Sequence, residues 1–204
     1  MITKNMWEFE DKYYHSGMQL ICGIDEAGRG PLAGPVCAAA VILPPHIEIP
    51  GLDDSKKLSD KRRRELFPVI KEKALAYGIG FADHKEIDEF NILQATFLAM
   101  ERAVSQLPIK PELLLVDGNQ FHDFGIPGDT VVQGDSRSAS IAAASILAKV
   151  SRDDYMLQMA EEYPQYAFEI HKGYGTKAHY AAISAHGHCP IHRLSFLKKF
   201  YGKK

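Results

Sequence analysis

The stretch Leu20-Ile21-Cys22-Gly23-Ile24-Asp25-Glu26-Ala27-Gly28-Arg29-Gly30 is the most informative part of the chain, because a short apolar run within it ends on two adjacent carboxylates. The apolar residues predict a buried strand over residues 19–27. Ionised carboxylates beside a core lose hydration at a cost of several kcal/mol unless a partner compensates, and a divalent cation is a natural partner. The Gly28-Arg29-Gly30 turn that follows can present backbone N–H groups and a guanidinium to a phosphate or a sugar. Together these features indicate phosphodiester chemistry.

Apolar runs along the rest of the chain predict a sheet with helices around it. The strands predicted after the first cover residues 36–43, 77–83, 113–116 and 130–132, and the predicted helices cover about 60–76, 91–107, 137–162 and 177–185. This order predicts an α/β fold with a mixed sheet flanked by helices. We expect residues 1–204 to form a single domain, in which about 170–204 make a small helical C-terminal extension.

Four carboxylates are the candidate catalytic and metal-binding residues: Asp25, Glu26, Asp117 and Asp135. Three separate strands end in or run into these residues, which predicts that they meet at one edge of the sheet. Side chains alternate along a strand, so Glu26 can join Asp25 only if the backbone turns there. Oxygen ligands favour Mg²⁺ or Mn²⁺, and two such ions about 4 Å apart can stabilise both oxygens of a phosphoryl displacement. The alternative for any one aspartate, and especially for Asp135 before Ser136, is a turn or a helix cap.

Charge is distributed unevenly along the chain. The net charge is −2, yet residues 137–204 carry 10 Lys and Arg against 5 Asp and Glu, together with five of the nine histidines. A basic C-terminal third beside an acidic body fits a carboxylate metal centre flanked by a surface that binds a nucleic-acid backbone. Ordinary uneven surface charge is the simpler alternative.

Composition also bounds the setting of the protein. The chain has no run of 18 apolar residues and does not begin with a basic-then-apolar signal layout, so we expect no membrane association. Its three cysteines, Cys22, Cys37 and Cys189, are odd in number and widely spaced. Cys22 and Cys37 lie in apolar runs and are expected to be buried thiols, which indicates a reducing, cytoplasmic setting.

Two loops offer further candidate contacts to a substrate. Lys56 and Lys57 can contact phosphate as point charges, although a solvated loop explains them equally well. Tyr174 lies between two glycines, with Lys172 and Lys177 nearby. An aromatic side chain on a basic, glycine-containing loop can stack on a sugar or a base, and the alternative is a partly buried core tyrosine.

Two other patterns fit their motifs poorly. Gly28-x-Gly30-x-x-Ala33 matches a dinucleotide fingerprint only in spacing, because prolines and a predicted strand follow where that motif needs a helix. The cluster of His186, His188, Cys189 and His192 matches no closed zinc module, so surface or packing roles are expected for it.

Taken together, the motifs resemble those of bacterial type 2 ribonuclease H (ribonuclease HII). The resemblance runs in the expected order from about residue 20 to 197, and it is carried by Asp25-Glu26-Ala27-Gly28-Arg29-Gly30, Asp54-Ser55-Lys56-Lys57-Leu58, Val116-Asp117-Gly118, Gly134-Asp135-Ser136, Ala143-Ala144-Ser145-Ile146-Leu147-Ala148-Lys149-Val150-x-Arg152-Asp153, Gly173-Tyr174-Gly175-Thr176 and Ile191-His192-Arg193-x-Ser195-Phe196. It implies a ribonuclease H-like fold whose C-terminal extension binds substrate.

The same resemblance implies an endonuclease that uses Mg²⁺ or Mn²⁺, with two ions during catalysis. Its substrates would be the RNA strand of RNA–DNA hybrids and duplex DNA containing single ribonucleotides, cut on the 5′ side to leave 3′-hydroxyl and 5′-phosphate ends. The four carboxylates become the metal ligands, Gly28, Arg29 and Gly30 contact the ribose 2′-OH, and Tyr174 stacks on the sugar at the RNA–DNA junction.

Other interpretations stay open from sequence. A non-catalytic nucleic-acid-binding module would retain the basic region, and a different metal-dependent phosphoesterase would retain the carboxylates. We expect a monomer. Whether a partner such as a sliding clamp tethers the protein is a question that the sequence leaves open. The segment from Phe196 to Lys204 is expected to be a solvated basic tail.

Overall fold

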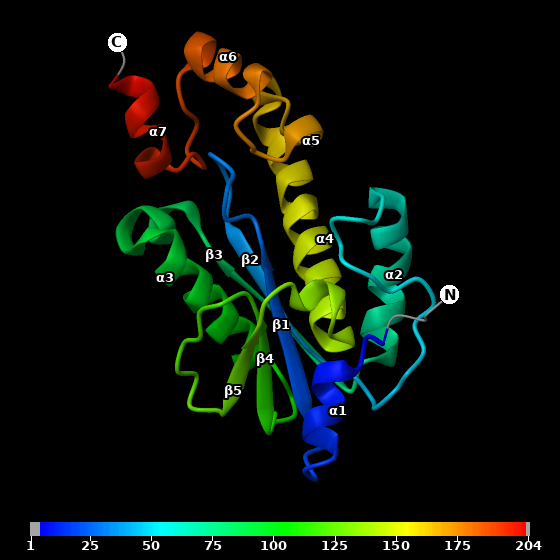
Figure 1. The fold of residues 1–204 in the computed structure, drawn as a ribbon. Coiled ribbons are helices and arrows are strands. Elements are labelled where there is room, and N and C mark those ends of the chain that lie inside the picture. Colours follow the sequence, from blue (N-terminus) through cyan, green and yellow to red (C-terminus); the bar gives the residue numbers. More distant parts are fainter. Residues whose placement is uncertain (1–4, 203–204) are drawn as a thin grey trace.

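The computed structural model describes residues 5–202, and its centre is a five-stranded sheet with the strand order β3-β2-β1-β4-β5 (Figure 1). The strands are β1 (Ile21–Ala27), β2 (Val36–Ile42), β3 (Ala76–Ala82), β4 (Leu113–Asp117) and β5 (Gly128–Val131). β1 pairs antiparallel with β2 and parallel with β4, so the sheet is mixed as predicted. The first strand therefore lies at the centre of the sheet, with its C-terminal end next to that of β4.

Helices cover both faces of this sheet. They are α1 (Glu8–Tyr14), α2 (Asp60–Lys73), α3 (His84–Ser105), α4 (Ala139–Glu162), α5 (Phe168–His171), α6 (Lys177–His186) and α7 (Leu194–Tyr201), with short 3₁₀ turns η1 (Gly134–Ser136) and η2 (Pro164–Tyr166). Figure 1 shows α2 and α4 on one side of the sheet, α3 on the other, and α6 and α7 at one end. The α/β architecture predicted from sequence is thus confirmed.

Small residues let α4 lie directly on the central strand. A Cβ added at Gly23 of β1 would come 2.2 Å from the carbonyl carbon of Ser140, so only glycine fits between strand and helix. The alanines on this side of α4, among them Ala143 and Ala144, are fully buried against β2. This close packing fixes the ends of β1 relative to the start of α4, where the candidate site lies.

The beginning of the chain contains a helix, α1, that the local sequence pattern did not predict. α1 lies beside the start of α4, because the buried carboxylate of Glu10 accepts hydrogen bonds from Ser138 Oγ (2.6 Å) and from the Ser140 backbone N–H (3.0 Å). Desolvation by burial raises the pKa of Glu10. This contact joins residues 128 and 130 positions apart, so local patterns could not indicate it.

α3 begins earlier than predicted, at His84 instead of about residue 91. Asp83 and Glu86 form a capping box, in which Asp83 accepts from the Glu86 N–H and Glu86 accepts from the Asp83 N–H. Asn91 then interrupts the helix with a φ of 71°. The predicted helix therefore corresponds to the part that follows this kink.

The C-terminal part is packed as far as residue 201, which corrects the expectation of a solvated tail from Phe196. Leu197 of α7 is fully buried, and Asp88 of α3 accepts hydrogen bonds from the backbone N–H groups of Leu194 (2.8 Å) and Ser195 (2.9 Å). Lys203 and Lys204 lie outside the described residues. Over residues 5–202, no helix is both long and apolar enough to cross a bilayer.

Candidate active site

Three aspartates from different elements meet at one edge of the sheet. Asp25 lies in β1, Asp117 ends β4 and Asp135 lies in η1. One carboxylate oxygen of each lies within 4.8 Å of the others. Asp25 and Asp135 are each only 3% exposed. The expectation that carboxylates from separate strands converge is met for these three residues.

Local backbone groups orient these carboxylates. The Gly134 N–H donates to Asp117 Oδ1 (2.7 Å), and the Glu26 N–H donates to Asp25 Oδ1 (2.7 Å). A Cβ added at Gly134 would lie 3.2 Å from Asp117 Oδ1 and closer still to Ile141, so glycine keeps the turn tight against the carboxylate. Asp135 does not cap α4, because Ser138 is the N-cap and accepts from the Ile141 N–H.

The electrostatics of the cluster favour binding of a cation. Desolvation, followed by the charges of Glu26 and Asp117, raises the pKa of Asp25 well above its usual range. Desolvation and the charge of Asp135 likewise raise the pKa of Asp117. Anionic groups held together in this way repel one another unless a positive charge lies between them. Oxygen-only ligands at this spacing fit Mg²⁺ or Mn²⁺.

Glu26 lies apart from the three aspartates, on the other face of β1. The strand continues through Ala27 without the turn that would bring Glu26 beside Asp25. Its carboxylate accepts from Arg29 Nη1 (3.3 Å) and lines a cavity of about 140 Å³ together with Asp117. Desolvation raises the pKa of Glu26 although Arg29 opposes the shift, and the Asp117 charge adds to it. Glu26 thus interacts electrostatically with the cluster from its opposite side.

Two buried arginines, which the sequence analysis did not single out for any role, hold the Gly28–Gly30 turn. Arg193 donates through Nη2 to the carbonyl of Gly28 (2.6 Å) and through Nη1 to that of Arg29 (2.9 Å). Gly28 has a φ of +98°, and a Cβ there would meet Arg152 Nε at 2.0 Å. The guanidinium groups therefore fill the space behind the turn and fix its carbonyl groups.

Arg152 connects this turn with the loop that carries Tyr174. It donates to the carbonyls of Pro35 (3.0 Å), Ala33 (3.2 Å) and Lys172 (3.1 Å), and its Cζ lies 5.8 Å from the Tyr174 ring centroid. The Tyr174 ring is 43% exposed. In the sequence, Arg152 could have been recognised as a charged residue on the buried side of a helix that is otherwise made of small residues.

The Tyr174 ring lies beside the turn that the resemblance assigns to 2′-OH recognition. A Cβ added at Gly30 would lie 3.8 Å from Tyr174 Cε1, and the Leu32 N–H donates to the Gly173 carbonyl (2.8 Å). Two segments far apart in sequence thus form one surface, at the turn that directly follows β1.

The two lysines after Asp54 differ in position. Lys56 Nζ lies 2.8 Å from Asp135 Oδ2, whereas Lys57 Nζ faces Asp53 (3.7 Å) and Asp54 (4.0 Å). Lys56 is therefore brought to the site, and Lys57 is directed into its own loop.

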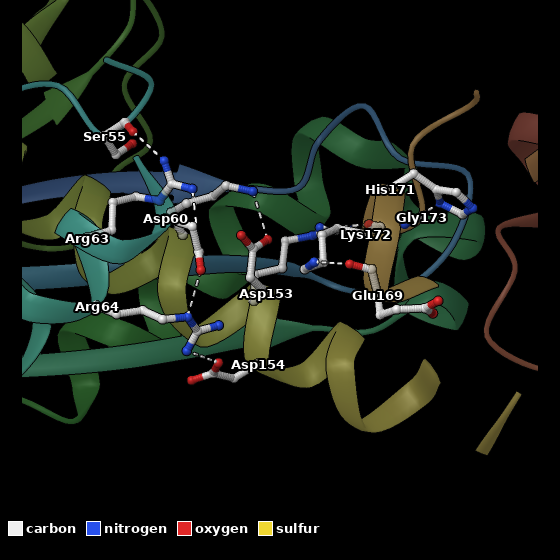
Figure 2. A network of polar contacts seen from close by, with 12 residues as sticks. Ser55, Asp60, Arg63, Arg64, Asp153, Asp154, Glu169, His171, Lys172 and Gly173 are labelled. Atoms are coloured by element: carbon white, nitrogen blue, oxygen red, sulfur yellow. Dashed lines mark hydrogen bonds and ion pairs between the residues drawn. The ribbon is translucent and has the colours of Figure 1, made fainter. Parts of the chain in front are cut away.

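α2 holds the loop that carries Lys56 and Lys57 through hydrogen bonds. Arg63 donates to the carbonyl of Ser55 (2.9 Å), and Ser55 Oγ lies 2.6 Å from Ser145 Oγ of α4. Arg64 bonds Asp154 (2.7 Å), which joins α2 to α4, as Figure 2 shows. These contacts anchor the loop next to the carboxylates.

The four-residue histidine and cysteine cluster does not form one site. His186 and His188 are exposed, whereas Cys189 and His192 are buried and in contact. Among residues 5–202, the aspartate cluster is the group of side chains with metal-binding geometry, and these residues are outside it.

Comparison with known proteins identifies relatives over nearly the whole chain. A family model described as Ribonuclease HII matches residues 22–199. A ribonuclease HII from Endomicrobium trichonymphae is 58% identical over 193 residues, covering 94% of this chain and 92% of that protein. One from Dechloromonas aromatica is 59% identical over 177 residues, covering 87% of this chain and 90% of that protein.

Solved structures share the fold. The ribonuclease H2 of Pyrococcus horikoshii OT3 superposes with a TM-score of 0.72 at 25% identity, covering 90% of this chain and 99% of that chain. Bst-RNase HIII in complex with Mn²⁺ superposes with a TM-score of 0.63 at 22% identity, covering 83% of this chain and 63% of that chain. Sheet order, helical layers and acidic edge define an enzyme of the ribonuclease H class. Within that class, the chain belongs to the ribonuclease HII family.

Proposed function

We propose that the protein is a metal-dependent endonuclease that hydrolyses the RNA strand of RNA–DNA hybrids and nicks duplex DNA on the 5′ side of single ribonucleotides. The products would carry 3′-hydroxyl and 5′-phosphate ends. The observation that carries this proposal is that β1 contributes Asp25 to the aspartate cluster, while the turn directly after β1 places Gly30 against Tyr174. A phosphodiester can then lie against the carboxylates while its sugar contacts that surface.

In this proposal Asp25, Asp117 and Asp135 would hold one divalent cation, and Glu26, which lines a cavity with Asp117, would help to hold a second. Mg²⁺ or Mn²⁺ bound there would supply an activated water and would stabilise charge on the departing 3′ oxygen. The chemistry of the donors supports this assignment, since all are carboxylate oxygens, and burial raises the pKa values of Asp25, Glu26 and Asp117. The Mn²⁺ complex of Bst-RNase HIII supports Mn²⁺ as one usable ion.

The protein residues mainly orient the substrate and compensate its charge. Backbone groups of Gly28 and Gly30 and the side chain of Arg29 contact the ribose 2′-OH. Tyr174 stacks on the neighbouring sugar, and the mainly exposed ammonium of Lys56 contacts a phosphate. Lys57 can contact a phosphate only if its ion pair with Asp53 breaks first.

The C-terminal extension, about 170–204, contributes Tyr174 and a basic surface to the nucleic-acid interface. All these residues belong to one chain, which supports a monomer as the active form. We place this activity in the cytoplasm, where the buried thiols of Cys22, Cys37 and Cys189 would stay reduced.

A substrate panel tests this function. The protein with Mg²⁺ is incubated with a one-ribonucleotide DNA duplex, an RNA–DNA hybrid, an all-DNA duplex and free nucleotides. The proposal predicts cleavage of the first two substrates only. Gel-shift binding without cleavage would favour a non-catalytic binding module, and turnover of free nucleotides would favour another phosphoesterase.

A further inference from the structure

Three histidines are buried where the proposed chemistry does not use them. We call them the histidine cluster: His171 is 8% exposed, His179 is 0% and His192 is 1%. The rings of His171 and His179 stack with centroids 4.5 Å apart. Desolvation, with a smaller contribution from the charges of neighbouring histidines, lowers the pKa of His179 and of His192 to about 4, so these rings are neutral at pH 7.

The hydrogen bonds fix which nitrogen of His192 carries the proton. The backbone N–H of Cys189 can only donate, and it lies 2.9 Å from His192 Nδ1. The thiol of Cys189 lies 3.1 Å from the same nitrogen, and desolvation raises its pKa to about 11, so it is a second donor. The carbonyl oxygen of Cys189 lies farther from Nδ1 (3.3 Å) and accepts from the backbone N–H of His192 instead (3.1 Å). Nδ1 is therefore an acceptor, and the neutral ring carries its hydrogen on Nε2.

The tautomer of His192 also determines which ring nitrogen of His179 carries the hydrogen. The two Nε2 atoms lie 3.0 Å apart, so His192 donates and His179 accepts. His179 then carries its hydrogen on Nδ1, which lies 3.0 Å from the carbonyl oxygen of Tyr174. The opposite direction would leave both nitrogens of His192 without a hydrogen, which a neutral imidazole does not allow.

His171 holds the other side of the same loop. Its Nδ1 accepts from the Gly173 N–H (3.2 Å), so its Nε2–H donates to the carbonyl of Tyr166 (2.9 Å). Figure 2 shows His171 and Gly173 next to each other. The Tyr174 N–H donates to the carbonyl of His171 (2.9 Å). The backbone of Tyr174 is thus held at both its N–H and its C=O, while its ring stays exposed.

We propose that the histidine cluster consists of positioning residues, whose neutral tautomers hold the Tyr174 backbone so that its ring lines up with the Gly28–Gly30 turn. This inference rests on the proposed function, in which Tyr174 stacks on the sugar at an RNA–DNA junction. Loss of the alignment therefore affects a one-ribonucleotide duplex more than a long hybrid, which contains many equivalent cleavage positions without such a junction.

Ring ¹⁵N chemical shifts of the wild type test the tautomers without any activity. A two-bond ¹H–¹⁵N correlation spectrum at pH 7 should show hydrogen on Nδ1 of His179 and on Nε2 of His171 and His192. Hydrogen on Nε2 of His179, or a charged ring at any of the three, would overturn the proposal.

Two substitutions at one position separate the donor from the rest of the ring. The amide nitrogen of His179→Asn can occupy the place of Nδ1 and donate to the Tyr174 carbonyl, whereas the amide of His179→Gln replaces Nε2 and leaves that carbonyl without its donor. We expect kcat/KM on a one-ribonucleotide duplex to fall by at least about tenfold in His179→Gln and by less than about threefold in His179→Asn. Exposed His186→Gln is the matched control and should act like the wild type.

Equal losses in His179→Asn and His179→Gln, with equal melting temperatures, would overturn the positioning role. A double-mutant cycle adds a second criterion, because His179→Gln should cost nothing further in a Tyr174→Ala background. Additive losses would contradict action through Tyr174. Absence of nicking by the wild type would overturn the proposed function and this substrate role with it, whereas the ring spectrum would still decide the tautomers.

Discussion

Lys56 Nζ lies 2.8 Å from Asp135 Oδ2, so an ammonium group from an exposed loop partly neutralises a cluster of buried carboxylates. Desolvation opposes the charge on Lys56, yet the hydrogen bond and charge of Asp135, followed by the charge of Asp25, raise its pKa. The ammonium thus provides part of the positive charge that the carboxylates need before a metal ion binds.

Lys56→Ala should make the metal-free protein less stable and more dependent on metal. The lysine of the Lys56–Asp135 pair is largely exposed. We therefore expect the free energy of unfolding to fall by about 1 kcal/mol or less, which corresponds to roughly 2–4 °C in melting temperature. Calorimetry in EDTA and in saturating Mg²⁺ measures this, and the Mg²⁺-induced increase should be larger in Lys56→Ala. Lys57→Ala is the control, and an equal effect there would refute the specific role of Lys56.

Alanine substitutions at Gly30 and Gly28 should separate an effect on substrate contact from an effect on the free energy of unfolding. Gly30 has ordinary backbone angles and room for a Cβ, so Gly30→Ala should change the free energy of unfolding by less than about 0.5 kcal/mol. It should still lower kcat/KM on a one-ribonucleotide duplex by about tenfold or more, since the added methyl group faces the sugar-binding surface.

Gly28→Ala, in contrast, should destabilise by more than about 2 kcal/mol, because of its positive φ and the contact with Arg152. Urea denaturation and steady-state nicking measure both effects. Normal activity in Gly30→Ala would exclude close approach of substrate at this residue.

Arg193→Gln should unfold the turn more easily. Three carbonyls, those of Gly28, Arg29 and Gly34, would lose their donor, and we expect a loss of at least about 2 kcal/mol in the free energy of unfolding. Arg137→Gln, at a half-exposed arginine, should cost less than about 1 kcal/mol. Urea midpoints measure both changes, and similar losses in the two variants would argue against this role of Arg193.

Stability should decrease as the pH falls below about 6.5, because the buried histidines resist protonation. With a folded pKa of about 4 and an unfolded value near 6.5, His179 gives its full contribution above pH 6.5 and loses it towards pH 4. Between pH 7 and pH 5 this amounts to about 2 kcal/mol for one such group. Asp25, whose pKa is raised, acts in the opposite direction, so variants are compared with the wild type.

The matched comparison uses His179→Asn, which removes one of these groups. Its urea midpoint should fall less than that of the wild type between pH 7 and pH 5. Parallel decreases in the two proteins would show that His179 is not the source of the pH dependence.

Local patterns were sufficient for the strands and for part of the site. The apolar run at Val36–Ile42 and the carboxylates at the ends of β1 and β4 are visible in sequence, because strand burial and strand tips have short-range signatures. The Asp83–Glu86 capping box was also present in sequence, and it marks the start of α3 that the helical periodicity alone missed.

Other features depend on contacts between distant segments. Arg193 bonds carbonyls 159 to 165 residues away, and Glu10 bonds Ser138, 128 residues away, so no local pattern encodes either partner. The different positions of Lys56 and Lys57 follow from the path of one loop against α4, which only the packed structure defines. The place of Glu26 opposite Asp25 follows from β1 continuing through Ala27.

The most direct measurement is the cut itself, mapped on a labelled DNA duplex that contains one ribonucleotide. With Mg²⁺ or Mn²⁺, we expect a single nick 5′ of the ribonucleotide with a 3′-hydroxyl end, and no nick in EDTA or in an all-DNA duplex. We also expect no turnover by Asp25→Asn, which should still bind the duplex. Asp123→Asn, in an exposed loop, is the control and should cut normally. Cleavage by Asp25→Asn at the wild-type rate would rule out Asp25 as a catalytic residue, and no cleavage by the folded wild type with either ion would rule out the proposed nuclease activity.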